Sequence, residues 1–518
     1  MSQQDRDPDS LTYGSFDRNH WHFKMRDFSS AVVQQSALSL ALIQVLPLEN
    51  SPYYRNGRIR EWALAGLDFW SRIQLKDGSF NEYYPFEHGY IPTSFSLFAA
   101  AEACRTLEVD NGDVINACLK AAAYLSKVEE TQALNQEAAA IPGLYATFLL
   151  SGEEWVRVAA EKKFNNLLEK QSAEGWFAEY GGADLGYLST TLDFLVEYQR
   201  MSGDPRAFAA AERILEFSQF FIHQDGSVGG QYGSRNTEYF LLSGLSALAA
   251  EVPLAAAMLA KLRQKIGTDE FFYAAFDDRY LCHNMMHSLL RAVRNGDPPG
   301  QPGGTLPCDR EHEQFFPQAG LLSLNKGAYH LICSLKKGGN FRLFAAGKEI
   351  FHDYGYRLQV GEGKRAATSW LNQDCQVETG ADGYCTSGAF TEVEQQRVTP
   401  WRHFLLRLAA RLLGRRLIPL LKKRLIFVDR RSRARFERRV RPGPEGVEVQ
   451  DHIWADRPLA RVYPADKFSL RHVASSKYFA MGELSEGETS GWARTRQVRL
   501  RRQIRIPGGQ VTSAAEVN

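Results

Sequence analysis

A short loop motif recurs along the first half of the chain with a period of about 50 residues. Its copies include QLKDGSFNEYYPF, QSAEGWFAEYGG and HQDGSVGGQYGS, in which an acidic residue and glycine precede a tyrosine. The acidic residues are Asp77, Glu174 and Asp225, at intervals of 97 and 51 residues. Segments with apolar residues at helical spacing stand between the loops. A period of this length, with two helices in each unit, indicates a helical repeat architecture.

Helical repeats either remain an open solenoid or curve and close into a ring. The loops in this chain are long, rich in glycine and aromatic, which is typical of loops that carry function. We therefore predict an α/α toroid, an incomplete or complete (α/α)6 barrel, over residues 28–295, after an N-terminal arm at 1–27. The open solenoid is the alternative. In a toroid, the loops at one end of the ring surround a funnel.

The sequence pattern changes after residue 295. The stretch RNGDPPGQPGGTLPC has the composition of a linker, which we place at 296–309. Beyond it, apolar and polar residues alternate between glycine-rich turns, as in antiparallel strands. We predict a β-sandwich over 310–518, so that the fold class is α+β with several domains. A helical, strongly basic segment at 401–427 interrupts the sandwich, and Pro419 is expected to end or kink it.

The basic segment dominates the charge distribution of the chain. The net charge is +2, yet residues 401–441 hold 15 Lys and Arg against two acidic residues. Leucines are interleaved with the cations, which suits docking on an anionic membrane surface. The alternative is a helix packed on the sandwich. We expect no nucleic-acid partner, because the basic stretch contains no recognisable nucleic-acid-binding module.

The sequence also bears on location and metal binding. The N-terminus is polar and acidic, no run reaches 18 uncharged apolar residues, and the seven cysteines form no CxxC pair. We expect a cytoplasmic protein, with peripheral attachment to the inner membrane as an option. His283 and His287 have the i, i+4 spacing of metal ligands, but no glutamate follows His283, so we expect neither a metal nor a cofactor.

Two segments resemble a known group of proteins. Residues 77–103, DGSFNEYYPFEHGYIPTSFSLFAAAEA, resemble the Asp-Gly loop of the heparinase II/III-like polysaccharide lyases, and are also similar to the Glu-Tyr-Pro segment of the glucuronyl C5-epimerases. Residues 315–339, FFPQAGLLSLNKGAYHLICSLKKGG, resemble the opening strands of the lyase sandwich. The resemblance implies a toroid followed by a sandwich, and an enzyme acting on a uronate-containing glycan.

Lyases and C5-epimerases of uronates share one difficult step, the removal of a proton from C5 beside a carboxylate. The site must neutralise the carboxylate and place a base within hydrogen-bond reach of the proton. The resemblance implies that Tyr84 or Tyr90 transfers the proton with His88 as its partner. Tyr239 is the candidate for a second acid or base, which an epimerase would need on the opposite face of the sugar.

Other residues of the loops are candidates for binding the substrate. Arg235 and Asn236 have the donor groups needed to hold the substrate carboxylate. The further binding candidates, all of which carry groups suited to sugar hydroxyls or rings, are Glu82, Glu179, Tyr180 and His283.

Several functions remain open at this point. The first is β-elimination by a polysaccharide lyase, and the second is C5-epimerisation at the same site during polysaccharide biosynthesis. A third is a glycoside hydrolase that uses paired carboxylates such as Glu82 and Glu179. A fourth is a non-catalytic scaffold that binds a glycan or a membrane. The expected partner is a glycan, free or lipid-linked.

Overall fold

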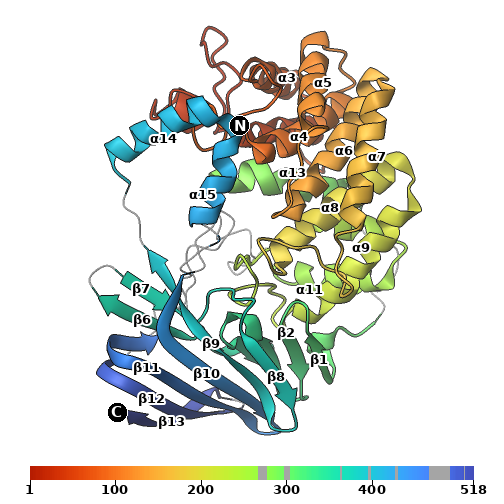
Figure 1. Ribbon diagram of the computed structural model, residues 1–518. Helices are drawn as coiled ribbons and strands as arrows, with labels where there is room; N and C mark the ends of the chain where they lie inside the picture. Colours follow the sequence, from red (N-terminus) through yellow and green to blue (C-terminus); the bar gives the residue numbers. More distant parts are fainter. Residues whose placement is uncertain are drawn as a thin grey trace.

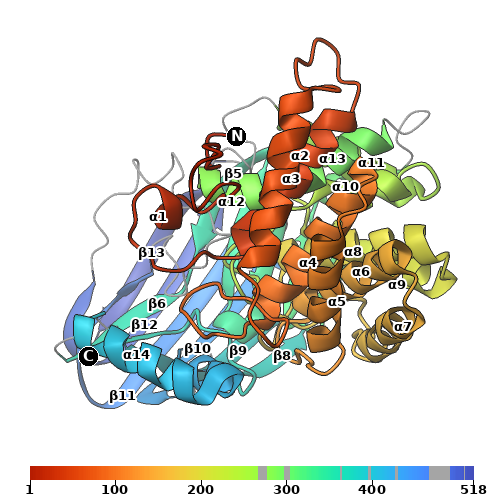
Figure 2. The ribbon, with the colours of Figure 1, turned by 90° about the horizontal axis from the view of Figure 1, so that it is seen from above.

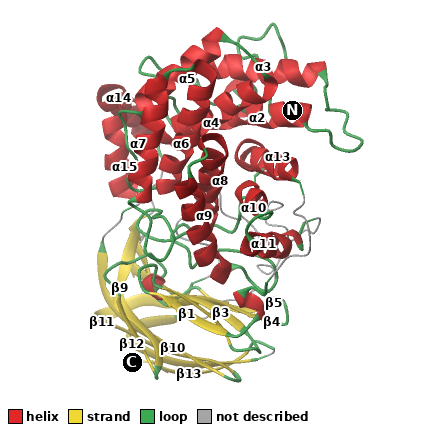
Figure 3. Ribbon diagram, turned by 90° about the vertical axis from the view of Figure 1, so that its right-hand side faces the viewer, coloured by secondary structure: helices red, strands yellow, loops and turns green. Residues whose placement is uncertain are grey.

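The computed structural model divides the chain into a helical region and a region of strands that follows it (Figures 1 and 3). The α+β class predicted from the sequence is confirmed. The structure describes residues 1–266, 277–296, 304–361, 364–394, 398–425, 427, 430–465, 491–506 and 508–517.

An inner layer of helices forms the centre of the helical region. Each inner helix contacts the next, and the last, α13, contacts the first, α2, so the circuit of contacts is closed. Most residues of α4, α6 and α8 are buried, as expected for helices that pack against neighbours on more than one side. The inner helices are α2 (Ser36–Val45), α4 (Tyr90–Leu107), α6 (Leu134–Ser151), α8 (Leu185–Ser202), α10 (Leu242–Leu248) and α13 (Met286–Asn295).

A second layer of helices covers the first (Figure 2). These helices bury one face each. Polar residues cap the first turn in α3 and α9: Asn56 accepts a hydrogen bond from the N–H of Arg58, and Asp204 precedes a proline at the first helical position. The outer helices are α3 (Gly57–Arg72), α5 (Gly112–Leu125), α7 (Glu154–Leu168), α9 (Pro205–Ser218) and α11 (Pro253–Arg263).

The repeated loop motif has a structural basis. Gly78 has φ +88°, and a Cβ at this position would lie 2.1 Å from the carbonyl oxygen of Lys120 in α5. Gly175 has φ +99°, and a Cβ at this position would lie similarly close to a carbonyl oxygen of α9. Gln74 and Gln171 stand four residues before these glycines, and each donates hydrogen bonds to the glycine carbonyl and to a carbonyl of the same outer helix. Only glycine fits this turn, which ties each loop to its outer helix.

The strands form two antiparallel sheets. The first sheet has the order β1-β2-β3-β4-β5 and the second has the order β10-β9-β7-β6-β11-β12-β13, with β8 paired to β9 and β10 also paired to β11. The strands are β1 (His312–Phe316), β2 (Leu321–Asn325), β3 (His330–Ser334), β4 (Asn340–Ala345), β5 (Lys348–Asp353), β6 (Tyr356–Gly361), β7 (Lys364–Ala367), β8 (Gln376–Gly380), β9 (Gly383–Glu394), β10 (Arg431–Gly443), β11 (Gly446–Pro464), β12 (Trp492–Arg505) and β13 (Gln510–Val517).

The two sheets share one hydrophobic core. Leu322, Leu331 and Leu343 from the first sheet pack in the same cluster as Val449 and Ile504 from the second. The sheets therefore pack face to face across this cluster.

The basic segment forms a helical pair inserted between β9 and β10. Helix α14 (Pro400–Leu413) and helix α15 (Leu417–Leu425) are separated at Gly414, while Pro419 lies in the first turn of α15, where no backbone N–H is needed. The predicted break therefore falls five residues earlier than Pro419. The pair is anchored on the helical region rather than on the sandwich: Arg407 pairs with Asp27 at 2.5 Å and Lys422 with Glu130 at 2.6 Å. Among the described helices, none combines the length and apolarity that crossing a bilayer requires.

Candidate active site

A cavity of about 690 Å³ lies where the inner helices begin. Its walls come from the loop before α4, the first turns of α6 and α8, the loop before α10, the turn before α13 and the inserted helix α15. Because helix N-termini carry partial positive charge, this end of the ring favours an anionic ligand. The lining includes Arg26, Gln35, Glu82, Tyr83, Tyr84, Glu87, Asn135, Gln136, Tyr180, Tyr187, Arg235, Arg279, Tyr280, His283, Asn284, Ile418, Leu421 and Lys422.

Arg235 is the cation that most clearly lacks a protein partner in this cavity. Its guanidinium lies 4.6 Å from the centre of the Tyr180 ring, and the residue is 9% exposed. Its Nε has no hydrogen-bond partner, and among the described residues no carboxylate forms an ion pair with it. The backbone is held firmly, because the Arg235 N–H donates to Asp184 at 2.9 Å. A buried, unpaired guanidinium is costly, which indicates a site for an anion.

The sandwich braces the loop that carries Arg235. The Nζ of Lys337 donates to the carbonyls of Gln231 and Gly233, at 2.5 and 2.7 Å, and to Oδ1 of Asn236 at 2.5 Å. Both regions of the protein therefore hold the backbone of the loop that carries Arg235.

His283 faces the cavity from a π-helical turn at Leu281–Met285, directly before α13. Both ring nitrogens are buried and neither has a hydrogen-bond partner in the described part of the chain. Burial, together with the nearby charge of Arg279, lowers the pKa of His283 to about 3, so the free imidazole is neutral at pH 7. The ring of Tyr280 lies 5.0 Å from it, centre to centre. π-helical turns are frequent at functional sites.

Two carboxyl groups enter the cavity from the loop before α4. Oε2 of Glu87 accepts hydrogen bonds from the backbone N–H groups of Glu82 and Tyr83, at 2.6 and 2.8 Å. Burial raises the pKa of Glu87, and burial together with repulsion from Glu87 raises the pKa of Glu82. Burial likewise raises the pKa of Tyr84, whose phenol therefore stays protonated at neutral pH.

Several buried polar atoms of the cavity wall have no hydrogen-bond partner among the described residues. Since most buried polar atoms in proteins are hydrogen-bonded, such a cluster indicates a polar ligand. The buried lining atoms with no hydrogen-bond partner among the described residues include Glu82 Oε2, Gln35 Oε1, Gln136 Oε1, Arg26 Nε, Arg235 Nε and both ring nitrogens of His283. Aromatic rings stand among them, a mixture that suits the polar edges and apolar faces of sugars.

The structure brings together half of the residues nominated from the sequence. Those that line the cavity are Glu82, Tyr84, Tyr180, Arg235 and His283. Those absent from its lining are His88, Tyr90, Glu179, Asn236 and Tyr239.

The residues outside the cavity have other partners. His88 Nδ1 is 2.7 Å from Asp77, and the Tyr90 hydroxyl accepts from Lys163 at 3.0 Å beside Glu137. The Tyr239 ring meets Tyr187 edge-on at 6.4 Å, within the helical core. Glu179 is buried and accepts from the N–H of Asn135 at 2.7 Å. The roles predicted for these residues stay predictions.

Several lining residues were not nominated from the sequence as site residues. Asn135 and Gln136 lie in the first turn of α6, and Tyr187 lies in the first turn of α8. Their position in the sequence could have identified them, because each of these residues stands at the start of an inner helix, directly after a loop. Arg279 and Tyr280 carried no such signal, because they stand in a short helix, α12 (Asp278–Tyr280), outside the motif.

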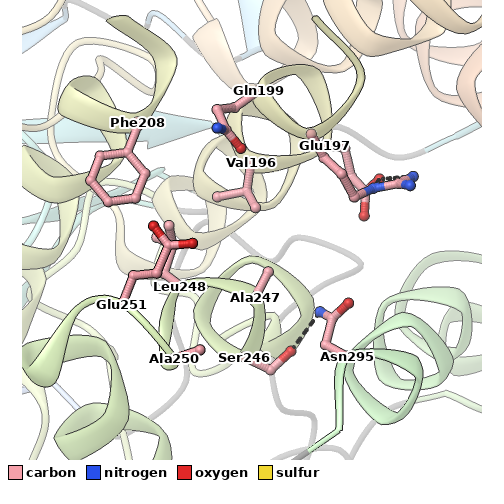
Figure 4. Close-up of a pocket in the computed structure, with 11 residues that line it drawn as sticks. Val196, Glu197, Gln199, Phe208, Ser246, Ala247, Leu248, Ala250, Glu251 and Asn295 are labelled. Carbon is pink, nitrogen blue, oxygen red and sulfur yellow. Dashed lines mark hydrogen bonds and ion pairs between the residues drawn. The ribbon is translucent and has the colours of Figure 1, made fainter. Parts of the chain in front are cut away.

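A smaller cavity of about 330 Å³ lies near the opposite ends of α8 and α10 (Figure 4). Its Glu197 is already paired with Arg200 at 2.7 Å and with Arg291 at 3.0 Å, and Asn295 donates to Ser246 at 2.9 Å. The polar groups named here satisfy one another, so this cavity is the weaker candidate. Among the described residues, no group of three or more His, Cys, Asp or Glu side chains is arranged to hold a metal.

The fold is that of a polysaccharide lyase, as the resemblance implied. The first similar structure is the chondroitin AC lyase of Streptomyces coelicolor A3 in complex with chondroitin sulphate, with a TM-score of 0.50 and 12% identity, covering 84% of this chain and 63% of that one. The Paenibacillus xanthan lyase has a TM-score of 0.47 and 10% identity, and the match covers 100% of this chain and 53% of that one. Heparinase III has a TM-score of 0.47 and 9% identity, and the match covers 94% of this chain and 82% of that one.

At these identities the likenesses concern architecture alone. The chain spans less than two thirds of the length of the chondroitin and xanthan lyases. No model of a protein family matches the chain, and no curated protein matches it either.

Proposed function

We propose that the protein is a carbohydrate-active enzyme that removes the C5 proton of a uronate residue in the 690 Å³ cavity and eliminates the group at C4. The observation that carries the proposal is the buried guanidinium of Arg235, which stacks on Tyr180 and pairs with no carboxylate among the described residues. A sugar carboxylate is an anion of the size and shape that a guanidinium binds with two hydrogen bonds. Elimination requires that this carboxylate be neutralised.

The proposed reaction assigns roles to Arg235, His283 and Tyr84. Arg235 holds the carboxylate, which makes the C5 proton more acidic. His283 is the candidate base: it is neutral in the free protein, and the negative charge of a bound carboxylate raises its pKa. The electron pair of the C5–H bond forms the C4–C5 double bond as the C4–O bond breaks. Tyr84, which burial keeps protonated, supplies a proton to the departing oxygen.

The rest of the wall suits a sugar. Tyr180, Tyr187 and Tyr280 line the cavity together with Asn135 and Asn284. Aromatic faces pack against the C–H faces of pyranose rings, while amides bond to hydroxyl groups. Asn284 Nδ2 already donates to the Tyr280 hydroxyl at 3.2 Å, which fixes both groups.

The test is incubation with a panel of uronate glycans in deuterated water. Elimination produces an unsaturated uronate with strong ultraviolet absorbance and a new reducing end. The Arg235→Gln variant should lose this activity, whereas the matched variant Arg206→Gln, at an exposed position on α9, should retain it.

Other outcomes of the same experiment identify other reactions. Deuterium at C5 without cleavage would show an epimerase, and new reducing ends without a double bond would show a hydrolase. No turnover of any glycan, with binding unaffected by Arg235→Gln, would contradict the proposal.

A further inference from the structure

Helix α14 presents an apolar face to the outside of the protein. Trp401, Phe404, Leu405, Leu408 and Leu412 follow the i, i+3, i+4, i+7, i+11 spacing of a single helix face. Trp401 is 68% exposed and Leu412 75% exposed, and the rings of Trp401 and Phe404 stack at 5.3 Å. This is the reverse of an ordinary surface helix, whose apolar face turns inward.

The opposite face of the helical pair is fixed to the protein. Ala410 and Leu417 are buried against Tyr84, and Arg407 pairs with Asp27. The guanidinium of Arg411 lies 5.8 Å from the Phe86 ring centre. The apolar face is therefore held outward by contacts on the other side. The helix itself lies at the edge of the molecule (Figures 1 and 2).

The charges around this face indicate what covers it. Residues 398–425 contain no acidic side chain, and Arg415, Arg416, Lys423 and Arg424, which follow α14 in the chain, are exposed. A second copy of the chain would bring like charges together across a two-fold interface. An anionic bilayer supplies both an apolar interior and negative headgroups, and cationic side chains can reach those headgroups while the apolar face is inserted.

We propose that α14 and α15 dock the protein in the plane of an anionic membrane surface, with Trp401, Phe404 and Leu412 inserted between the headgroups. This inference does not depend on the reaction proposed above. The same helical pair contributes Ile418, Leu421 and Lys422 to the wall of the large cavity. Docking therefore places the cavity beside the bilayer, where a glycan attached to a lipid can reach it.

The experiment is flotation of the full-length protein with vesicles of phosphatidylcholine alone or with one part in three of phosphatidylglycerol. The protein should float with the anionic vesicles, and Trp401→Glu with Leu412→Glu should weaken this binding about tenfold or more. The matched control is Leu149→Glu with Trp155→Glu, at exposed positions on α6 and α7, which should bind as the unchanged protein does.

A second variant, Arg415→Gln with Arg416→Gln, keeps the apolar face and should also lose about tenfold in binding to anionic vesicles. All substituted residues are exposed, so thermal unfolding should stay unchanged. The proposal is overturned if the protein floats with neither vesicle, or if both Glu pairs lower binding equally. It is also overturned if sedimentation shows a dimer that Trp401→Glu with Leu412→Glu dissociates, because a second copy then covers the face.

Discussion

The guanidinium of Arg235 rests on the face of Tyr180 at 4.6 Å, and Lys422 approaches the same ring at 5.5 Å. The phenol ring thus contacts a cation from the loop before α10 and a cation from the inserted helix α15. Lys422 has a carboxylate partner in Glu130, whereas Arg235 has none among the described residues. This difference singles out Arg235 as the group available to a substrate.

Replacing Arg235 with glutamine should lower turnover of a uronate glycan by about 10²–10³-fold, because a preorganised donor to the carboxylate is lost. The free energy of unfolding should change by less than about 1 kcal/mol, since no ion pair is broken. Steady-state kinetics and urea titration of the same preparation check both expectations. A large loss of stability would instead make Arg235 a structural residue.

Replacing Arg291 with glutamine should have the opposite effect. Arg291 is fully buried and pairs with Asp193 at 2.5 Å and Glu197 at 3.0 Å; Glu197 keeps its pair with Arg200, but the loss of Arg291 leaves the buried Asp193 without the cation it pairs with. Breaking such a pair costs about 3–5 kcal/mol. Urea titration should show this loss, while the protein that remains folded keeps its affinity for the glycan. Unchanged stability would refute the assigned role of Arg291.

The pH dependence of stability should depend on His283. Its pKa is lowered in the folded protein to about 3, whereas the unfolded chain binds the proton near pH 6.5. The unfolded state therefore gains a proton first as the pH falls, and the folded state loses stability below about pH 6.5. Relative to wild type, His283→Gln should recover about 1.4 kcal/mol for each pH unit between about 6.5 and 5. Chemical unfolding at several pH values measures this difference, and a pH-independent difference would contradict the burial of the ring.

Two tyrosines of one motif should respond differently to loss of the hydroxyl. Tyr90 bonds to the buried Lys163–Glu137 pair, so Tyr90→Phe should reduce stability by about 1–3 kcal/mol and leave kcat nearly unchanged. Tyr84 lines the cavity, so Tyr84→Phe should reduce kcat by about 10²-fold or more with little change in stability. If Tyr90→Phe abolishes turnover in folded protein, the role suggested by family resemblance is correct and our assignment is not.

The repeat and the loops of the site could be predicted from the sequence, but the orientation of the side chains could not. Gly78 and Gly175 recur because each turn approaches a carbonyl of an outer helix, and such backbone constraints leave a readable period. Tyr84 and Tyr90 both belong to one motif, yet one lines the cavity and the other is buried at the start of α4. Their spacing alone does not distinguish these positions, because the loop between them contains positive φ values at Phe86 and His88 that redirect the chain.

Other features depend on long-range packing and could not be predicted from the sequence. The basic segment was readable as an amphipathic helix, but its anchors at Asp27 and Glu130 lie more than 290 residues away in sequence. Likewise, nothing local shows that Lys337 of the sandwich braces the loop of Arg235. Contacts of this kind depend on the tertiary fold rather than on local pattern.

The most direct test compares binding of one acidic oligosaccharide with binding of the same oligosaccharide after its carboxyl groups have been reduced to alcohols. Calorimetric titration of the wild-type protein should show a preference of about tenfold or more for the acid, and Arg235→Gln should remove that preference. Equal affinity of the wild-type protein for both sugars, or a preference that survives in Arg235→Gln, would show that Arg235 does not hold a uronate carboxylate.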